Sequence, residues 1–157
     1  MNIHKKFLSK KKFKNMQDFM MGLYFPWYFI DCVSIKDDGF FQFEFLFFKD
    51  SQNCSQEYMD LIQPILSKLK YKKLLRVKAN LLTQTNKIIE HGMHIDRKIG
   101  KTSIFYINNC NGYTKFKNGE KIISEENKLV EFNSTLEHSG SSCTDQKRRV
   151  VINFNYQ

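Results

Sequence analysis

The sequence predicts an α+β fold in which N-terminal helices back a barrel-like double sheet. Apolar residues recur at helical spacing in the first half of the chain. From residue 74 onward the pattern changes to short alternating segments separated by turn residues. With 157 residues, of which 41% are hydrophobic, the chain has room for one globular domain with one core.

The first half begins with six lysines within residues 1–18, which we expect to form a basic lead-in to a single domain of residues 19–157. Residues 41–45 alternate strictly between apolar and polar side chains and predict a half-buried strand. Residues 55–70 carry apolar side chains on one helical face, with Ser55 as the N-cap. Pro64 is expected to kink this helix or to mark the start of its second part.

Strands dominate the second half. They are expected at residues 74–82, 102–108, 112–116, 128–132 and 149–156. Turn-forming residues occur at 108–112 and at Asn118-Gly119 between these strands. Together these segments predict a barrel core that covers about residues 74–157.

The formal net charge of +9 has two explanations. A basic surface attracts nucleic acid or another anionic partner. The abundance of Lys, Asn and Ile is also what an AT-rich coding sequence produces, and we favour this explanation over a nucleic-acid partner. The apolar run at residues 19–30 is too short to span a bilayer, so no membrane partner is expected.

Four cysteines occur without any CxxC pair, which gives no support for a zinc ribbon or a thioredoxin-like motif. Free thiols, together with the lack of a secretory signal pattern, predict a reduced cytoplasmic setting, or the host cytoplasm if the source is viral.

A metal site is predicted by His94-Ile95-Asp96 and by His138, which follows Asp96 by 42 residues (138 − 96). Residues i and i+2 of a strand point to the same face, so His94 and Asp96 can bind one ion. Two imidazoles and one carboxylate are the ligand set of a non-haem iron(II) site with open positions. Zinc accepts the same ligands, and an HxD motif alone also arises by chance.

A cation for a dicarboxylate co-substrate is predicted in the last strand. The guanidinium of arginine grips a carboxylate with two parallel hydrogen bonds. Strand parity places Arg149 and Asn153 on a polar face that also holds Asn155, and it places Val150, Ile152, Phe154 and Tyr156 on an apolar face toward the helices. Arg149 is therefore favoured as the anchor, and Arg148 is the alternative; a solvated arginine pair would also fit the pattern.

Further polar residues are candidates for ligand contacts. The hydroxyl of Tyr106 can donate a second hydrogen bond to the same carboxylate, although a core role fits its position equally well. Arg76, Lys78 and Asn80 alternate along one strand face, where they either meet a substrate or face solvent. Asn155, in the last strand, is the fourth candidate for a substrate contact.

From Arg76 onward the chain resembles the iron(II)/2-oxoglutarate-dependent dioxygenases. The resemblance is carried by the HID motif at 94–96, FYIN at 105–108, GYTKF at 112–116, LVEF at 129–132, HSG at 138–140 and RVVINFNY at 149–156. These pieces look like the prolyl 4-hydroxylase-like branch, in particular its small versions from phages and marine bacteria. The match from Arg76 to the end covers about half of the chain.

The resemblance implies a double-stranded β-helix, that is, a jelly-roll or cupin-like barrel, with iron inside. It implies His94, Asp96 and His138 as iron ligands, Arg149 as the 2-oxoglutarate anchor and Tyr106 as its helper. It further implies that O2 and 2-oxoglutarate are co-substrates, that succinate and CO2 are released, and that ascorbate can assist. The implied reaction is hydroxylation of an unactivated C–H bond.

Several classes of function remain open at this stage. A hydroxylase of a protein or peptide side chain is favoured. An oxidative nucleic-acid dealkylase usually carries a further arginine six residues after the anchor, where this chain has Asn155. A small-metabolite hydroxylase fits the compact size. A metal-binding β-barrel without activity would not need an arginine for a dicarboxylate.

Overall fold

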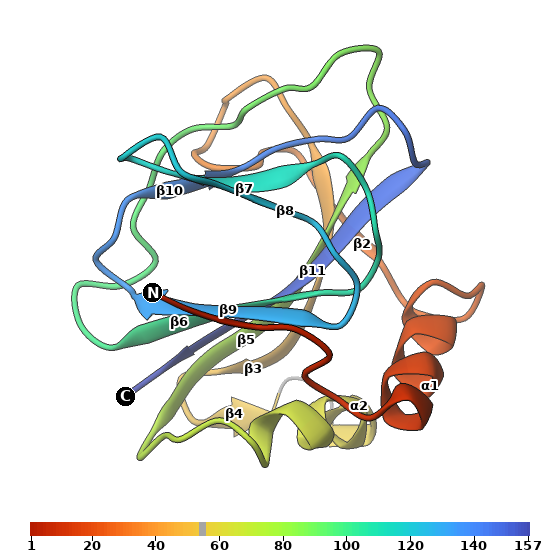
Figure 1. Cartoon of the computed structure of the whole chain (residues 1–157), viewed down its shortest axis with the longest axis vertical. Helices are drawn as coiled ribbons and strands as arrows, with labels where there is room; N and C mark the ends of the chain where they lie inside the picture. The colour runs from red at the N-terminus through yellow and green to blue at the C-terminus, as the bar shows by residue number, and fades with distance from the viewer. Residues whose placement is uncertain (54–55) are drawn as a thin grey trace.

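The computed structural model describes residues 1–53 and 56–157, and this part of the chain forms two antiparallel sheets and two helices (Figure 1). The larger sheet contains, in spatial order, β1 (Asn2–His4), β9 (Lys128–Asn133), β6 (Lys101–Tyr106), β11 (Arg148–Tyr156), β5 (Leu74–Thr83), β3 (Gln42–Lys49) and β2 (Tyr28–Ile30), with β4 (Gln52–Asn53) paired to β3. The smaller sheet contains β10 (His138–Gly140), β7 (Tyr113–Phe116) and β8 (Lys121–Ile123).

The two sheets face each other, with the smaller sheet across from the larger one (Figure 1). Buried side chains of both sheets form a cluster that joins them: Ile104, Tyr106, Phe116, Ile122, Val130, Phe132 and Val151. The segment after β5 runs past β10 and forms isolated bridges with it and with the residues that follow it, at Glu90–Ser141 and at His94–His138. This path brings residues 90–96 to the rim of the space between the sheets.

Both helices, α1 (Lys10–Met20) and α2 (Gln56–Leu66), lie on the outer face of the larger sheet (Figure 1). Phe13, Met16 and Met20 form the buried stripe of α1, while its lysines are exposed. The ring of Phe13 packs edge-on against Phe105 of β6, with 6.0 Å between ring centroids. The main hydrophobic core therefore lies between the helices and the larger sheet.

The five strands expected in the second half are confirmed, with ends that differ by at most two residues, and the strand expected at 41–45 is observed as β3, which continues to Lys49. The helix predicted at 55–70 is observed as α2, which contains Pro64 and ends at Leu66; Ser55, its expected N-cap, lies outside the described residues. Residues 1–18 carry β1 and most of α1. No helix within the described residues is long and apolar enough to cross a membrane.

Strand β11 lies at the centre of the larger sheet, hydrogen-bonded to β5 on one side and to β6 on the other. Its register places Asn155 between Arg76 and Thr102, and Asn153 between Lys78 and Ile104. Cross-strand partners share a face of the sheet, so these side chains face the space between the sheets. The other face of β11 is part of the main core, as the strand parity predicted.

Ile152→Ala tests how far this core holds the sheet together. Ile152 is fully buried in the main core, so we expect the free energy of unfolding to fall by about 2–5 kcal/mol from lost burial and the cavity left behind. Denaturation by urea measures this change. Ile123→Ala, at a half-exposed position of β8, is the matched control and should change stability by less than about 0.5 kcal/mol. Equal effects of the two substitutions would contradict the assignment of the core.

Candidate metal and dicarboxylate site

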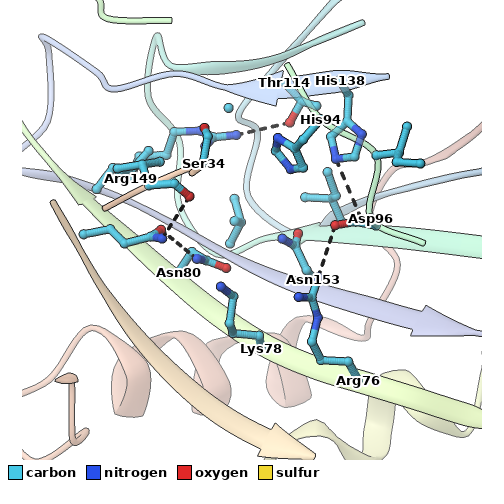
Figure 2. Close-up of a pocket in the computed structure, with 17 residues that line it drawn as sticks. Ser34, Arg76, Lys78, Asn80, His94, Asp96, Thr114, His138, Arg149 and Asn153 are labelled. Carbon is cyan, nitrogen blue, oxygen red and sulfur yellow. Dashed lines mark hydrogen bonds and ion pairs between the residues drawn. The ribbon is translucent and has the colours of Figure 1, made fainter. Parts of the chain in front are cut away.

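His94, Asp96 and His138 come together at the rim of the space between the sheets (Figure 2). The backbones of His94 and His138 exchange two hydrogen bonds, each 3.0 Å long, which place the two imidazoles side by side. The backbone N–H of Asp96 donates to the carbonyl of Ser134 at 3.2 Å. One ligand atom of each of the three side chains lies within 4.8 Å of the others, so they can share one ion.

Hydrogen bonds select the histidine nitrogens that face the ion. Nδ1 of His94 lies 3.0 Å from the carbonyl oxygen of Gly92, and Nδ1 of His138 lies 2.9 Å from that of Leu136. A carbonyl oxygen only accepts, so each Nδ1 carries the proton and each Nε2 keeps its lone pair. Burial lowers the pKa of His138, although the negative charge of Asp96 opposes this. The neutral imidazole is the form that binds a metal.

The carboxylate of Asp96 is buried in a network of donors. Arg76 donates to Oδ1 at 3.1 Å, and Thr102 and Asn155 donate to Oδ2 at 2.7 and 3.2 Å. Burial alone would raise the pKa of Asp96, but His138, Thr102 and Arg76 outweigh it and lower the pKa. A carboxylate has about four lone-pair positions, so these three bonds leave one for a metal. The three side chains thus fit a divalent ion such as iron(II).

Arg149 is buried, with 3% of its surface exposed, and it has no acidic partner among the described residues. Its Nε donates to the Ser124 hydroxyl at 2.7 Å and one terminal nitrogen donates to Thr114 Oγ1 at 3.2 Å. Burial lowers the pKa of the guanidinium. A buried charge is costly unless an opposite charge and hydrogen bonds compensate it, so this position favours an anionic ligand.

Thr114 connects Arg149 with Tyr106. The hydroxyl of Tyr106 donates to Thr114 Oγ1 at 2.9 Å, and the guanidinium carbon of Arg149 lies 5.8 Å from the centre of the Tyr106 ring. Because Thr114 Oγ1 accepts from both residues, its own hydrogen is left to donate. Thr114 borders the cavity, whereas Tyr106 is fully buried behind it.

A cavity of about 280 Å³ joins the histidine–aspartate cluster to Arg149 (Figure 2). Its lining includes the candidates His94, Asp96, His138, Arg149, Asn153, Arg76, Lys78 and Asn80. Arg148, Tyr106 and Asn155 are not part of the lining. The guanidinium of Arg148 donates to the carbonyl of Met21 and borders a separate apolar groove, and Asn155 bonds to Asp96 behind the cavity wall.

Thr102, Thr114 and Ser124 were not predicted from the sequence. Thr102 and Thr114 lie within strands β6 and β7, and Ser124 directly follows β8. Small hydroxyl residues are common in strands, so only their contacts with Asp96 and Arg149 distinguish these three. The only signal in the sequence that could have indicated Thr102 is that it shares the strand face of Tyr106, which was a candidate.

Solved structures share this fold at low sequence identity. A prolyl-4-hydroxylase of Pseudomonas putida aligns over 99% of this chain and 92% of its own, with a TM-score of 0.60 and 12% identity. A prolyl hydroxylase of Trichoplax adhaerens, solved with a peptide of the hypoxia inducible factor oxygen degradation domain, aligns over 99% and 82%, with a TM-score of 0.65 and 14% identity. The non-haem α-ketoglutarate-dependent epimerase SnoN from nogalamycin biosynthesis aligns over 99% and 77%, with a TM-score of 0.69 and 8% identity.

SnoN is also known in complex with Fe3+, α-ketoglutarate and nogalamycin RO, and that structure aligns with a TM-score of 0.68 and 8% identity. The sequence of this chain matches no family model and no curated protein. The likeness therefore concerns the fold: the chain has the double-stranded β-helix, or jelly-roll, fold of the 2-oxoglutarate–iron(II) oxygenases, as the sequence predicted.

Thr102→Val tests the network around Asp96. The substitution keeps the shape of the side chain but removes the hydroxyl that donates to Asp96 Oδ2 at 2.7 Å. Because loss of such an outer partner typically weakens metal affinity about 10- to 100-fold, we expect this loss for iron(II), measured anaerobically by calorimetry. Ser103→Ala is the control, since the Ser103 hydroxyl pairs with Tyr156 on the other face of β6. Unchanged affinity in Thr102→Val would show that Asp96 does not depend on this bond.

Proposed function

We propose that this protein is an iron(II)- and 2-oxoglutarate-dependent oxygenase that hydroxylates an unactivated C–H bond of a protein or peptide side chain, with release of succinate and CO2. The observation that carries the proposal is the pairing of two features in one cavity. A cluster of two imidazoles and a carboxylate lies at one end, and a buried guanidinium without an acidic partner among the described residues lies at the other.

In this proposal His94 and His138 hold iron(II) through Nε2 and Asp96 holds it through a carboxylate oxygen. Arg149 and the free hydrogen of Thr114 bind the far carboxylate of 2-oxoglutarate, and Tyr106 fixes Thr114 from behind. When bound, iron(II) and 2-oxoglutarate supply the oxidising power for C–H hydroxylation. The chain itself orients both ligands, directs Nε2 of each imidazole toward the metal position and shields the site from bulk water.

The cavity wall that contains Gln42 and Asn80 favours a substrate that donates hydrogen bonds. Gln42 Nε2 donates to the carbonyls of Cys32 and Val33, both at 3.2 Å, so Gln42 Oε1 is left to accept from Asn80 Nδ2 at 2.7 Å. This chain of bonds fixes the Asn80 amide, whose Oδ1 is buried without a partner in the described residues. A peptide N–H is a donor of the kind that this oxygen needs.

The size of the cavity favours a side chain over a complete metabolite as the substrate group. A volume of about 280 Å³ is at the lower end of ligand pockets, and 2-oxoglutarate would occupy part of it. Lys78, which also borders the cavity, is paired with Glu44 at 2.8 Å, so its charge is already compensated. This pairing leaves little attraction for a phosphate backbone at this wall.

Turnover without a substrate tests the enzyme class. Anaerobically purified protein given iron(II), 2-oxoglutarate and O2 should form succinate slowly. Oxidative decarboxylation of 2-oxoglutarate to succinate and CO2 is expected to continue at a low rate when no substrate is present. His138→Ala removes one of the three metal-binding side chains and should abolish this activity. Succinate is measured by mass spectrometry. No succinate from the wild-type chain, with no 2-oxoglutarate binding in the presence of iron(II), would favour a metal-binding barrel instead.

Arg149→Ala tests the anchor for the co-substrate. Hydrogen bonds to a charged group contribute about 1.5–3 kcal/mol, so the substitution should weaken 2-oxoglutarate binding about 10- to 100-fold. Calorimetric titration of the iron(II)-loaded protein measures the affinity. Arg148→Ala is the matched control, because this neighbouring guanidinium contacts Met21 outside the cavity and its removal should leave the affinity unchanged. The reverse result would assign the anchor to Arg148.

A further inference from the structure

We propose that Cys110, Cys143 and Asp145 form a second metal site, for a thiophilic divalent cation such as Zn2+. The two thiol sulfurs and a carboxylate oxygen of Asp145 lie within 4.8 Å of one another. Both cysteines are buried and Asp145 is exposed. A cation can therefore enter from the side of Asp145, and water can complete its coordination there.

The two loops that carry these ligands are held in place by four hydrogen bonds. The backbone N–H of Asn111 donates to both carboxylate oxygens of Asp145, at 3.0 and 3.1 Å. The side chain of Asn111 donates to Thr144 Oγ1 at 2.7 Å and accepts from the Thr144 N–H at 2.9 Å. The ligands are thus positioned before a metal arrives, which reduces the entropy cost of binding.

The donor set suits zinc better than a hard cation. Thiolates select soft or borderline metals, and zinc accepts sulfur together with a carboxylate oxygen. On ligation each S–H bond is replaced by a sulfur–metal bond, and the two thiol protons go to solvent. Two thiolates and one carboxylate carry three negative charges, of which a divalent ion neutralises two.

A metal fits this cluster better than a disulfide does. Both cysteines are free thiols, and the Sγ of Cys143 donates to the carbonyl of Gln146 at 3.2 Å. The carboxylate of Asp145 lies within 4.8 Å of both sulfurs, where it can serve as a third ligand of a metal ion, whereas a disulfide would make no use of it. A bound metal ion deprotonates a coordinating thiol.

The site would stiffen the loops that hold Arg149. The backbone N–H of Cys110 donates to the carbonyl of Ser124 at 3.2 Å, and the Ser124 hydroxyl accepts from Arg149. At Gly112, two residues beyond Cys110, a Cβ atom would lie 2.6 Å from Cδ of Arg149. The loop of Cys110 thus packs directly against the arginine side chain.

Titration of the reduced full-length protein with Co2+ under anaerobic conditions tests the proposal. Thiolate–cobalt bonds give a charge-transfer absorption in the near ultraviolet, whereas nitrogen and oxygen ligands do not. We expect this band in the wild-type protein and, unchanged, in His138→Ala, since the histidine–aspartate cluster contains no sulfur. Cys110→Ser and Cys143→Ser should lose most of the band.

Cys32→Ser is the matched control for loss of a thiol, because Cys32 lies outside the cluster, and it should keep the full band. If a buried serine prevents folding of the cysteine variants, Asp145→Asn provides the test instead, because it changes an exposed side chain. This variant should keep the band but weaken the affinity for Co2+ at least about tenfold. No band in the wild-type protein, or a full band in both cysteine variants, would overturn the proposal. A disulfide between Cys110 and Cys143 in anaerobically purified protein would also overturn it and assign a redox pair.

Discussion

The alternation of side chains along β11 is the constraint on which the rest of the structure depends. Val150, Ile152 and Phe154 point into the core under the helices, while Arg149 and Asn153 point into the cavity. Hydrogen bonds to β5 and β6 fix the register on both sides. A slip by one residue would move the guanidinium into the hydrocarbon core and the aliphatic side chains into the cavity. The hydrophobic core therefore holds the polar site in place.

The cavity combines two buried charges that do not neutralise each other. At one end Asp96 is bonded to Arg76 and to neutral donors, and it keeps a position for a cation. At the other end, the hydrogen bonds of the Arg149 guanidinium within residues 1–53 and 56–157 go only to the hydroxyls of Ser124 and Thr114. The cost of burying each charge falls when a ligand brings the opposite charge. In the proposed function, a metal ion beside Asp96 and a dicarboxylate beside Arg149 would supply these opposite charges, so one pair of ligands would account for both ends.

The sequence predicted those parts of the molecule that follow from local periodicity. The alternation in residues 149–156 assigned both faces of β11 correctly. His94 and Asp96 do lie together, but residues 94–96 belong to no strand of the structure, and the backbone bonds between His94 and His138 place the cluster instead. The helix α1 was not predicted. Its apolar residues Phe13, Met16 and Met20 are spaced as in a helix, but they are interspersed with lysines, and the segment was therefore interpreted as a basic lead-in. The partners of Asp96 and Arg149 could not be predicted, because they lie on strands whose pairing is decided by the packing of the whole chain.

The cluster of Cys110, Cys143 and Asp145 is a second site that could not be predicted from the sequence. Cys110 and Cys143 are 33 residues apart (143 − 110), which matches no metal-binding spacing, and they meet only because the loops after β6 and β10 lie side by side. A short sequence motif identifies metal ligands that are close together in the chain. Ligands from two different loops become neighbours only through the fold, so their spacing in the sequence does not reveal them.

The fold leaves the choice of reaction open, because one architecture serves both prolyl hydroxylases and the epimerase SnoN. What distinguishes this chain must lie in the residues that surround a substrate. Asn80, held by Gln42, and Lys78, held by Glu44, form a wall whose polar atoms are fixed before any ligand binds. Fixed polar groups reject ligands that leave them unpaired. In the proposed function, substrate selection depends on β3 and β5, while the strands around β11 carry the residues proposed to hold the metal and the dicarboxylate.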